Sequence, residues 1–144
     1  QLSTEWRQFR LNAITSLVNE IVDIAHSKNK KVTAAVFPFP EMSRQMVRQA
    51  WNDWNLDSAY PMLYNNFYRE NINWIGFATK QGVSDVDFPI HSGLYAGALK
   101  NPGDFEKAYN ISKENGASGI SIFTADGLND EQKSFLVNLK NSKK

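Results

Sequence analysis

The sequence predicts an α/β fold with parallel strands, and three observations support this class. Short apolar runs bounded by Gly, Pro and Asn alternate along the chain with longer segments of helical periodicity. The short runs are apolar on both sides, as strands of a parallel sheet are when both faces are covered. At 144 residues the chain has the length of one domain with its own core. We therefore expect a single domain over residues 1–144, built as a leading helix followed by four strand–helix units.

The leading helix is predicted over about residues 3–27, where apolar residues recur at spacings of three and four. Ser3 or Thr4 can cap its start, and the cationic segment SKNKK suits its end. The apolar run at residues 32–37 then predicts the first strand. The segment PFPEM closes this strand, because its two prolines exclude both a strand ladder and a helix.

The remaining elements continue the alternation. We expect helices over about residues 43–54, 69–81, 105–115 and from Asn129 or Asp130 onward, and strands over about residues 57–64, 88–95 and 119–123. Trp51 and Trp54 are three residues apart and would share the inner face of the first of these helices. Gly82 is the predicted C-cap of the second helix.

Two architectures fit this order of elements. One is a small open, doubly wound sheet, and the other is half of a (β/α)8 TIM barrel, whose whole form takes about 250 residues. No glycine-rich loop of the GxGxxG or Walker type follows any predicted strand, which argues against a nucleotide-binding version of the open sheet. A leading helix with no strand before it is what a barrel divided partway through would show, so we expect the half barrel.

Charge and composition restrict the possible partners. The net charge of +1 gives no support for binding nucleic acid or an anionic membrane, and no apolar run approaches the length of a membrane span. Cysteine is absent, which excludes a disulfide framework and a thiolate metal site. His26 and His91 alone make no histidine metal site, and we expect no metal or cofactor. The first residue is Gln1, not Met, so we expect an excised or mature piece from which a targeting segment has been removed.

Aromatic and amide side chains concentrate around the exit of the second predicted strand, at Tyr60, Tyr64, Asn65 and Tyr68. A sugar offers apolar faces to aromatic rings and hydroxyls to amides, so this set indicates a carbohydrate site. The alternative is a strand edge with ordinary core tyrosines. The functional groups of parallel α/β folds lie at the carboxyl ends of the strands, which is where this set falls.

Other candidates for substrate binding lie on the same predicted side of the sheet. Tyr95 follows the third strand and His91 lies within it. For His91 a hydrogen-bonded core histidine is the first interpretation and ligand contact the second. The start of the leading helix would bring Trp6 and Arg7 near these strand exits. Asp57 begins its strand and is therefore expected at the opposite end, in a structural role.

Glu41 and Asp126 are the carboxylates that follow the first and fourth predicted strands. Two carboxylates that face one cleft are what glycoside hydrolysis uses, one as acid and the other as base or nucleophile. We therefore take this pair as the catalytic candidates. For each residue the alternative is an ordinary role near a helix start, as a cap or as a partner of the helix dipole.

The run WNDWNLDSAYPMLYNNFYRENINWIG also resembles a known family. Its spacing W-x-x-W-x-x-D-x-x-x-P-M-x-Y is met by Trp51, Trp54, Asp57, Pro61, Met62 and Tyr64. Together with Trp6-Arg7, AVFPFPEM, HSGLYAG and GASGISIF, it resembles the later half of barrel-type bacterial glycoside hydrolases of the glycosyl-hydrolase-like family 10 group. The resemblance implies the C-terminal half of a TIM-barrel catalytic domain that acts in polysaccharide breakdown. It also implies a secreted, periplasmic or cell-surface location.

Two functions from different classes follow. The first is a glycoside hydrolase domain, whose isolated half would be inactive, and the second is a non-catalytic carbohydrate-binding or assembly module. A small nucleotide-binding domain is a weaker third. In the family register the strands at residues 32–37 and 119–123 would be open edges, so we expect a homodimer that pairs these edges or covers the open face. A flat, monomeric open sheet is the alternative.

Overall fold

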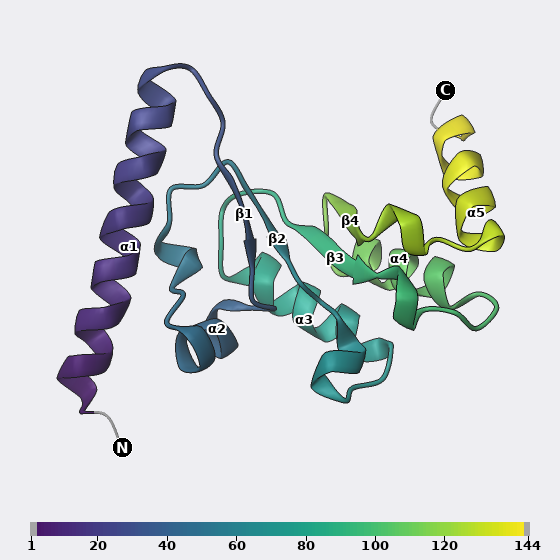
Figure 1. Ribbon diagram of the computed structural model, residues 1–144, viewed down its shortest axis with the longest axis horizontal. Helices are drawn as coiled ribbons and strands as arrows, with labels where there is room; N and C mark the ends of the chain where they lie inside the picture. The colour runs from purple at the N-terminus through teal and green to yellow at the C-terminus, as the bar shows by residue number, and fades with distance from the viewer. Residues whose placement is uncertain (1–2, 143–144) are drawn as a thin grey trace.

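A computed structural model describes residues 3–142 (Figure 1). Its helices are α1 (Thr4–Ser27), α2 (Pro40–Val47), α3 (Asn73–Ser84), α4 (Asp104–Glu114) and α5 (Asp130–Asn141). Its strands are β1 (Thr33–Val36), β2 (Ser58–Pro61), β3 (His91–Tyr95) and β4 (Gly119–Phe123). Four 3-10 turns follow α2 and the last three strands, namely η1 (Trp51–Asp53), η2 (Asn65–Tyr68), η3 (Ala96–Ala98) and η4 (Ala125–Gly127). A leading helix followed by four strand–helix units is the order that the sequence predicts.

The four strands are parallel and follow one another in space as they do in the chain. β1 pairs with β2, and β3 pairs with β4. Two parallel bridges, Ala59 to Ile90 and Met62 to Gly93, join the two pairs. The resulting order β1-β2-β3-β4 leaves β1 and β4 at the ends. The predicted α/β class with parallel strands is therefore confirmed.

Two apolar clusters fill the space between the strands and the helices. The first surrounds Trp51 and contains Val22 of α1 with Val36, Trp54, Leu56, Ala59 and Ile90. The second contains Leu63, Leu94 and Leu99 with Ile75 and Ala78 of α3 and Phe105 and Ala108 of α4. A buried hydrogen bond of 2.8 Å between the hydroxyls of Thr79 and Ser92 also ties α3 to β3. Figure 1 shows α3 and α4 behind the strands.

The other face of the strands is open. In the parallel register Ala35 lies beside Tyr60, and His91 beside Gly119, while the rings of Tyr60 and His91 stack between these pairs. None of these four residues belongs to either apolar cluster of the described chain. A doubly wound sheet carries helices on both faces, whereas the apolar contacts of the described helices are made on one.

Two helix starts confirm the sequence prediction in detail. The Ser3 hydroxyl accepts a hydrogen bond from the backbone N–H of Trp6 and caps α1. Asn129 caps α5 through a reciprocal pair with Gln132, in which each side chain accepts from the backbone N–H of the other residue. Both caps use a short polar side chain and a backbone N–H three residues on, which is why the sequence shows them.

The predicted helix over residues 43–54 is wrong in both of its bounds. α2 starts at Pro40, because proline suits the first turn of a helix, where its missing N–H costs nothing. Arg48 adopts a left-handed conformation with φ 63° and ends the helix. Trp51 and Trp54 therefore do not share a helical face. Both are buried, one within the η1 turn and the other just after it.

The helix predicted over residues 69–81 also differs. The η2 turn and the left-handed Arg69, with φ 58°, delay the start of α3 to Asn73. Gly82 lies inside α3 and is not its C-cap, which is Asp85. A Cβ atom at Gly82 would lie 3.4 Å from the Trp51 ring, an ordinary van der Waals distance, so α3 passes close to the first cluster at this residue. The second and third strands are likewise shorter than predicted.

Candidate functional site

Four aromatic rings gather where β2, β3 and β4 end. They belong to Tyr64, Phe67, Tyr95 and Phe123, and we call them the exit cluster. The ring of Tyr64 lies 5.9 Å from that of Tyr95 and is stacked 5.7 Å from that of Phe123. The rings of Phe67 and Tyr95 are 5.7 Å apart. Each ring thus contacts at least two others.

The parallel topology brings these rings together. Tyr95 and Phe123 are register partners in the last positions of β3 and β4. Tyr64 follows β2 at the same edge, and Phe67 lies on the η2 turn directly after it. Gly97 leaves room for the Tyr95 ring, since a Cβ atom there would lie 2.8 Å from it. The cluster is therefore positioned by strand register and by two short turns.

The exit cluster combines exposed rings with a partly buried hydroxyl. Phe67 and Phe123 are 65 % and 50 % exposed, although neither is polar. Burial raises the pKa of Tyr64, and its hydroxyl, protonated at neutral pH as in any tyrosine, can donate a hydrogen bond. Burial, followed by the nearby Tyr64, also raises the pKa of Tyr68, whose ring packs 5.1 Å from that of Trp74. This site thus offers apolar ring faces and neutral hydroxyls.

A second aromatic contact lies deeper on the open face. The rings of Tyr60 and His91 stack at 4.8 Å with 17° between their planes. A Cβ atom at Gly119 would lie 2.9 Å from His91 Cδ2, so glycine in β4 makes room for the imidazole. The buried Nδ1 atom of His91 has no hydrogen-bond partner among residues 3–142.

The other predicted binding residues lie apart from these rings or serve the local fold. The Asn65 amide donates a 3.0 Å hydrogen bond to the backbone oxygen of Glu70, which closes the η2 turn. Trp6 stacks on Phe9 of α1 at 5.4 Å, and within the described residues neither ring contacts one of the exit cluster. Arg7 is exposed on the same helix.

The two candidate catalytic carboxylates are both exposed. Glu41 lies in the first turn of α2 and accepts a 2.6 Å hydrogen bond from the Gln45 amide. Asp126 lies in the η4 turn. Among residues 3–142 no ion pair or hydrogen bond joins the two. The position of Glu41 also fits its alternative role beside the positive end of a helix dipole.

Asp57 has the structural role expected for it. Its Oδ2 atom lies 2.9 Å from His26 Nε2 and accepts a 2.6 Å hydrogen bond from the backbone N–H of Val32. The His26 hydrogen bond, followed by the one from Val32, lowers the pKa of Asp57. The carboxylate thus fastens the end of α1 to the starts of β1 and β2.

Sequence reasoning missed Phe67 and Phe123 as members of the site. The emphasis on hydroxyls and amides favoured the tyrosines, and phenylalanines near strands are more often core residues. A signal was present for Phe123, which ends its apolar run as Tyr95 ends the preceding one. Phe67 follows Tyr64 by three residues in the same polar segment.

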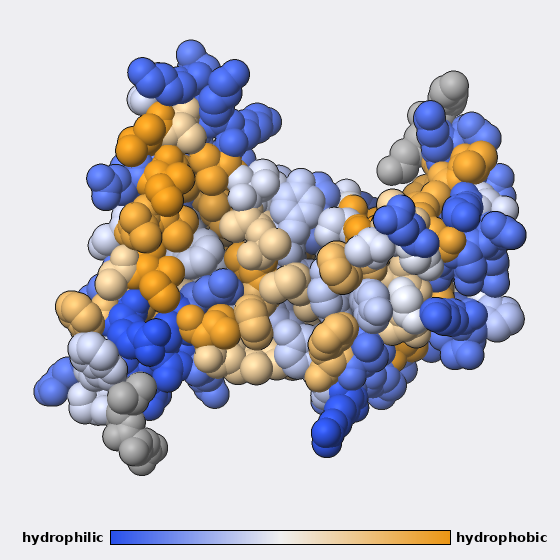
Figure 2. Space-filling view, viewed as in Figure 1, coloured by the Kyte–Doolittle hydropathy of each residue, from blue (hydrophilic) through white to orange (hydrophobic). Residues whose placement is uncertain are grey.

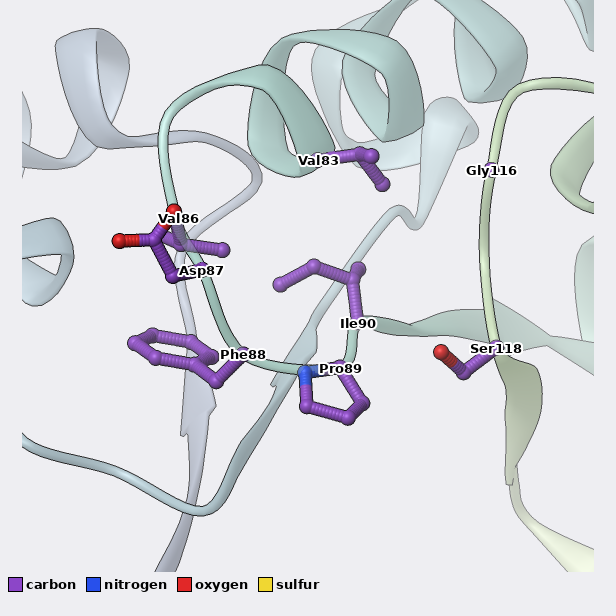
Figure 3. A pocket seen from close by; sticks show the side chains of 8 residues that line it. All are labelled: Val83, Val86, Asp87, Phe88, Pro89, Ile90, Gly116 and Ser118. Carbon is purple, nitrogen blue, oxygen red and sulfur yellow. The ribbon is translucent and has the colours of Figure 1, made fainter.

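A cavity lies away from the exit cluster, beside the residues that precede β3 and β4. It holds about 310 Å³ and is lined by Val83, Val86, Asp87, Phe88, Pro89, Ile90, Gly116 and Ser118 (Figure 3). In TIM barrels the amino-terminal ends of the strands contribute to stability, whereas the active site lies at the carboxyl ends. Its lining includes Val83, Val86, Phe88 and Ile90, which also belong to the first apolar cluster or pack against it.

Across residues 3–142 no three His, Cys, Asp or Glu side chains come together as a metal site. No helix in this part of the chain is both long and apolar enough to cross a bilayer.

The fold and this surface define a class, an α/β protein with four parallel strands and aromatic rings at the strand exits. Comparison of the chain with models of protein families, with curated proteins and with solved structures finds no match.

Proposed function

We propose that this chain binds a neutral carbohydrate at the exit cluster and is the C-terminal half of a glycoside hydrolase barrel. The observation that carries the proposal is the exit cluster itself, four rings at three adjacent strand ends, each in contact with at least two of the others. Sugar rings present C–H faces that stack on aromatic faces and hydroxyls that pair with neutral donors. We also propose that the natural ligand is a polysaccharide and that the protein binds it outside the cytoplasm.

The chemistry of the cluster favours an uncharged ligand. Two of its rings are phenylalanines at least half exposed, and the Tyr64 hydroxyl is held in its neutral form. Large exposed rings that contact one another are costly to leave in water and mark interaction sites. Without a charged side chain among its four members, the cluster would bind with little dependence on salt.

The barrel part of the proposal is supported by the arrangement of the strands. They run in chain order, and their apolar contacts with the helices are made on one face, as in a segment of a TIM barrel. The aromatic rings lie at the carboxyl ends of the strands, where barrel enzymes place their sites. The open face with Tyr60 and His91 would then line the barrel interior.

Catalysis by Glu41 and Asp126 together is less well supported than binding. They follow β1 and β4, which lie three strand spacings apart, about 14 Å in a sheet. Retaining and inverting glycosidases hold their carboxylates about 5–5.5 Å and about 6.5–9.5 Å apart. This separation favours the second function, carbohydrate binding without catalysis, for the chain by itself. Each carboxylate remains a candidate for pairing with a group on the other half of a barrel.

The test is a titration of the chain with neutral gluco-, xylo- and manno-oligosaccharides, followed by NMR. We expect shifts in the amides that flank Tyr64, Tyr95 and Phe123. Phe123→Ala should weaken binding about three- to tenfold, the usual contribution of one stacked ring. Phe77→Ala is the matched control, because Phe77 is 53 % exposed on α3, in the helix layer. Equal binding by the two variants, or no response to any sugar, would contradict the proposal.

A further inference from the structure

A row of exposed apolar residues runs along α1. It consists of Trp6, Phe9, Ala13, Leu17, Ile21 and Ile24, which we call the α1 stripe. Its five large members are 48–60 % exposed. Figure 2 shows apolar residues along the length of this helix. Their spacing of three or four residues places them on one side of an α-helix.

The α1 stripe is separate from the face that holds the helix to the fold. That face carries Leu11, Ile14, Val18 and Val22, which are buried or pack against the first cluster. At 3.6 residues per turn, the centres of the two faces differ by about 120° around the helix. Substitutions in the stripe should therefore leave the fold intact. Monomeric proteins rarely leave so long an apolar surface in water.

The residues of the stripe are symmetric in their spacing, and the pairs that this symmetry brings together are complementary in size. A half-turn about an axis through the level of Thr15 exchanges Trp6 with Ile24, Phe9 with Ile21 and Ala13 with Leu17. Each aromatic side chain would then meet a β-branched one, and the small Ala13 would meet a leucine. A small residue opposite a large one lets two helices approach closely and interdigitate.

The charges beside the stripe match the same half-turn. Arg10 and Glu20 are exposed on its two flanks, five residues before and five after Thr15. In an antiparallel pair of α1 helices, Arg10 of one copy lies level with Glu20 of the other, within reach of its long side chain. A parallel pair would place Arg10 level with Arg10 and Glu20 with Glu20, which is unfavourable.

From these observations we infer that the α1 stripe binds a second copy of this chain in an antiparallel, twofold-symmetric helix pair. The helix of 24 residues is about 36 Å long, enough for a continuous seam. Five large apolar side chains from each copy would leave water there, within an isologous interface of the kind most dimers use. This interface differs from the pairing of strand edges, and it leaves the exit cluster free. It therefore does not depend on carbohydrate binding, but it competes with the half-barrel proposal, because the other half of a barrel would lie against α1 and cover the same stripe.

The first test measures association by sedimentation equilibrium across a concentration series. We expect a dimer whose dissociation constant rises at least about tenfold in Leu17→Glu, because the symmetry places two unpaired carboxylates in the seam. Val137→Glu on α5 is the matched control, since Val137 is 58 % exposed and lies outside the stripe. A monomer, or a dimer that both variants leave unchanged, would overturn the inference.

The second test fixes the direction of the helices. Arg10→Glu should weaken the dimer, and the double change Arg10→Glu with Glu20→Arg should restore it. Because the chain has no cysteine, Phe9→Cys and Ile21→Cys chains can also be mixed and treated with a short bismaleimide. We expect cross-linking in the mixture but not in either variant alone, where the two thiols would be about 18 Å apart.

Cross-linking within the Phe9→Cys variant alone would indicate a parallel pair and refute the inferred arrangement. Anionic lipid vesicles provide a further control, since an apolar helix face also suits a membrane surface. Binding of the wild-type chain to such vesicles, lost in Leu17→Glu and accompanied by a monomer in solution, would assign the stripe to a lipid surface instead.

Discussion

Replacement of Gly93 by alanine tests the connection between the two strand pairs. Gly93 lies in β3 at one of the two bridges that join it to β2. A Cβ atom at this position would lie 2.6 Å from the backbone oxygen of Pro61 and 3.3 Å from Met62 Cα. Both neighbours are backbone atoms, which cannot rotate away as a side chain would. The strands must therefore separate to admit a methyl group.

The expected cost follows from this geometry. A contact of 2.6 Å must open by at least about 0.4 Å to reach the shortest distances that Cβ atoms show. The Leu63 N–H donates to the Gly93 oxygen at 2.9 Å, and the same movement would weaken that bond. Overpacking costs about 1–3 kcal/mol, and a weakened hydrogen bond adds up to about 1 kcal/mol. We expect a loss of about 2–3 kcal/mol in the free energy of unfolding.

The assay is urea unfolding followed by tryptophan fluorescence, with Gly127→Ala as the control. A Cβ atom at Gly127 meets only the Thr124 hydroxyl, at 3.8 Å, so this change should leave stability within about 0.5 kcal/mol of wild type or raise it slightly. Amide exchange at Leu63 should also accelerate in Gly93→Ala. If the two alanine variants unfold at the same urea concentration, the close approach of β2 and β3 is wrong.

Two further changes test local contacts. The hydrogen bond with His26 lowers the pKa of Asp57 below its ordinary value of 3.8. The Asp57 carboxylate therefore stabilises the fold fully above pH 3.8, and this stabilisation is lost as pH falls through the lowered pKa. Asp57→Asn should therefore be less stable at pH 6 and lose less stability between pH 5 and pH 2 in urea titrations, and parallel pH profiles would contradict this. Gln132→Ala should cost about 2–4 kcal/mol in thermal or urea unfolding, because the buried amide donates to the backbone oxygens of Ala96 and Leu99 and completes the α5 cap. An unchanged midpoint would show that water replaces these bonds.

The sequence was most informative where the determining contacts are local. The caps at Ser3 and Asn129 join residues only three apart, so their residue types identify the helix starts. The strand at Gly119–Phe123 also has its predicted bounds, because a short apolar run stands between polar turns. The sequence predicted that Pro40 would exclude a helix, but α2 starts at this residue. Proline disrupts a helix in its interior and is well tolerated in its first turn.

The site was less accessible to sequence reasoning because strand register creates it. Tyr64 and Phe123 lie far apart in the chain, yet their rings stack at 5.7 Å once β2, β3 and β4 align. The rule that strand exits carry function placed Tyr64 and Tyr95 at one edge, where the structure has them. It could not show that exposed phenylalanines would complete the set, because exposure is decided by which side of the sheet the helices cover.

The division of each strand into a side covered by helices and an open side affects which mutations this protein can tolerate during evolution. The buried residues Leu63 and Leu94 pack with the helices in the second apolar cluster. The rings of the exit cluster do not belong to that cluster and pack on one another. Mutations at the strand exits can therefore accumulate without exhausting the stability of the domain. If the exit cluster binds the proposed carbohydrate, selection for a different ligand could replace Phe67 or Phe123 one at a time while the chain still folds.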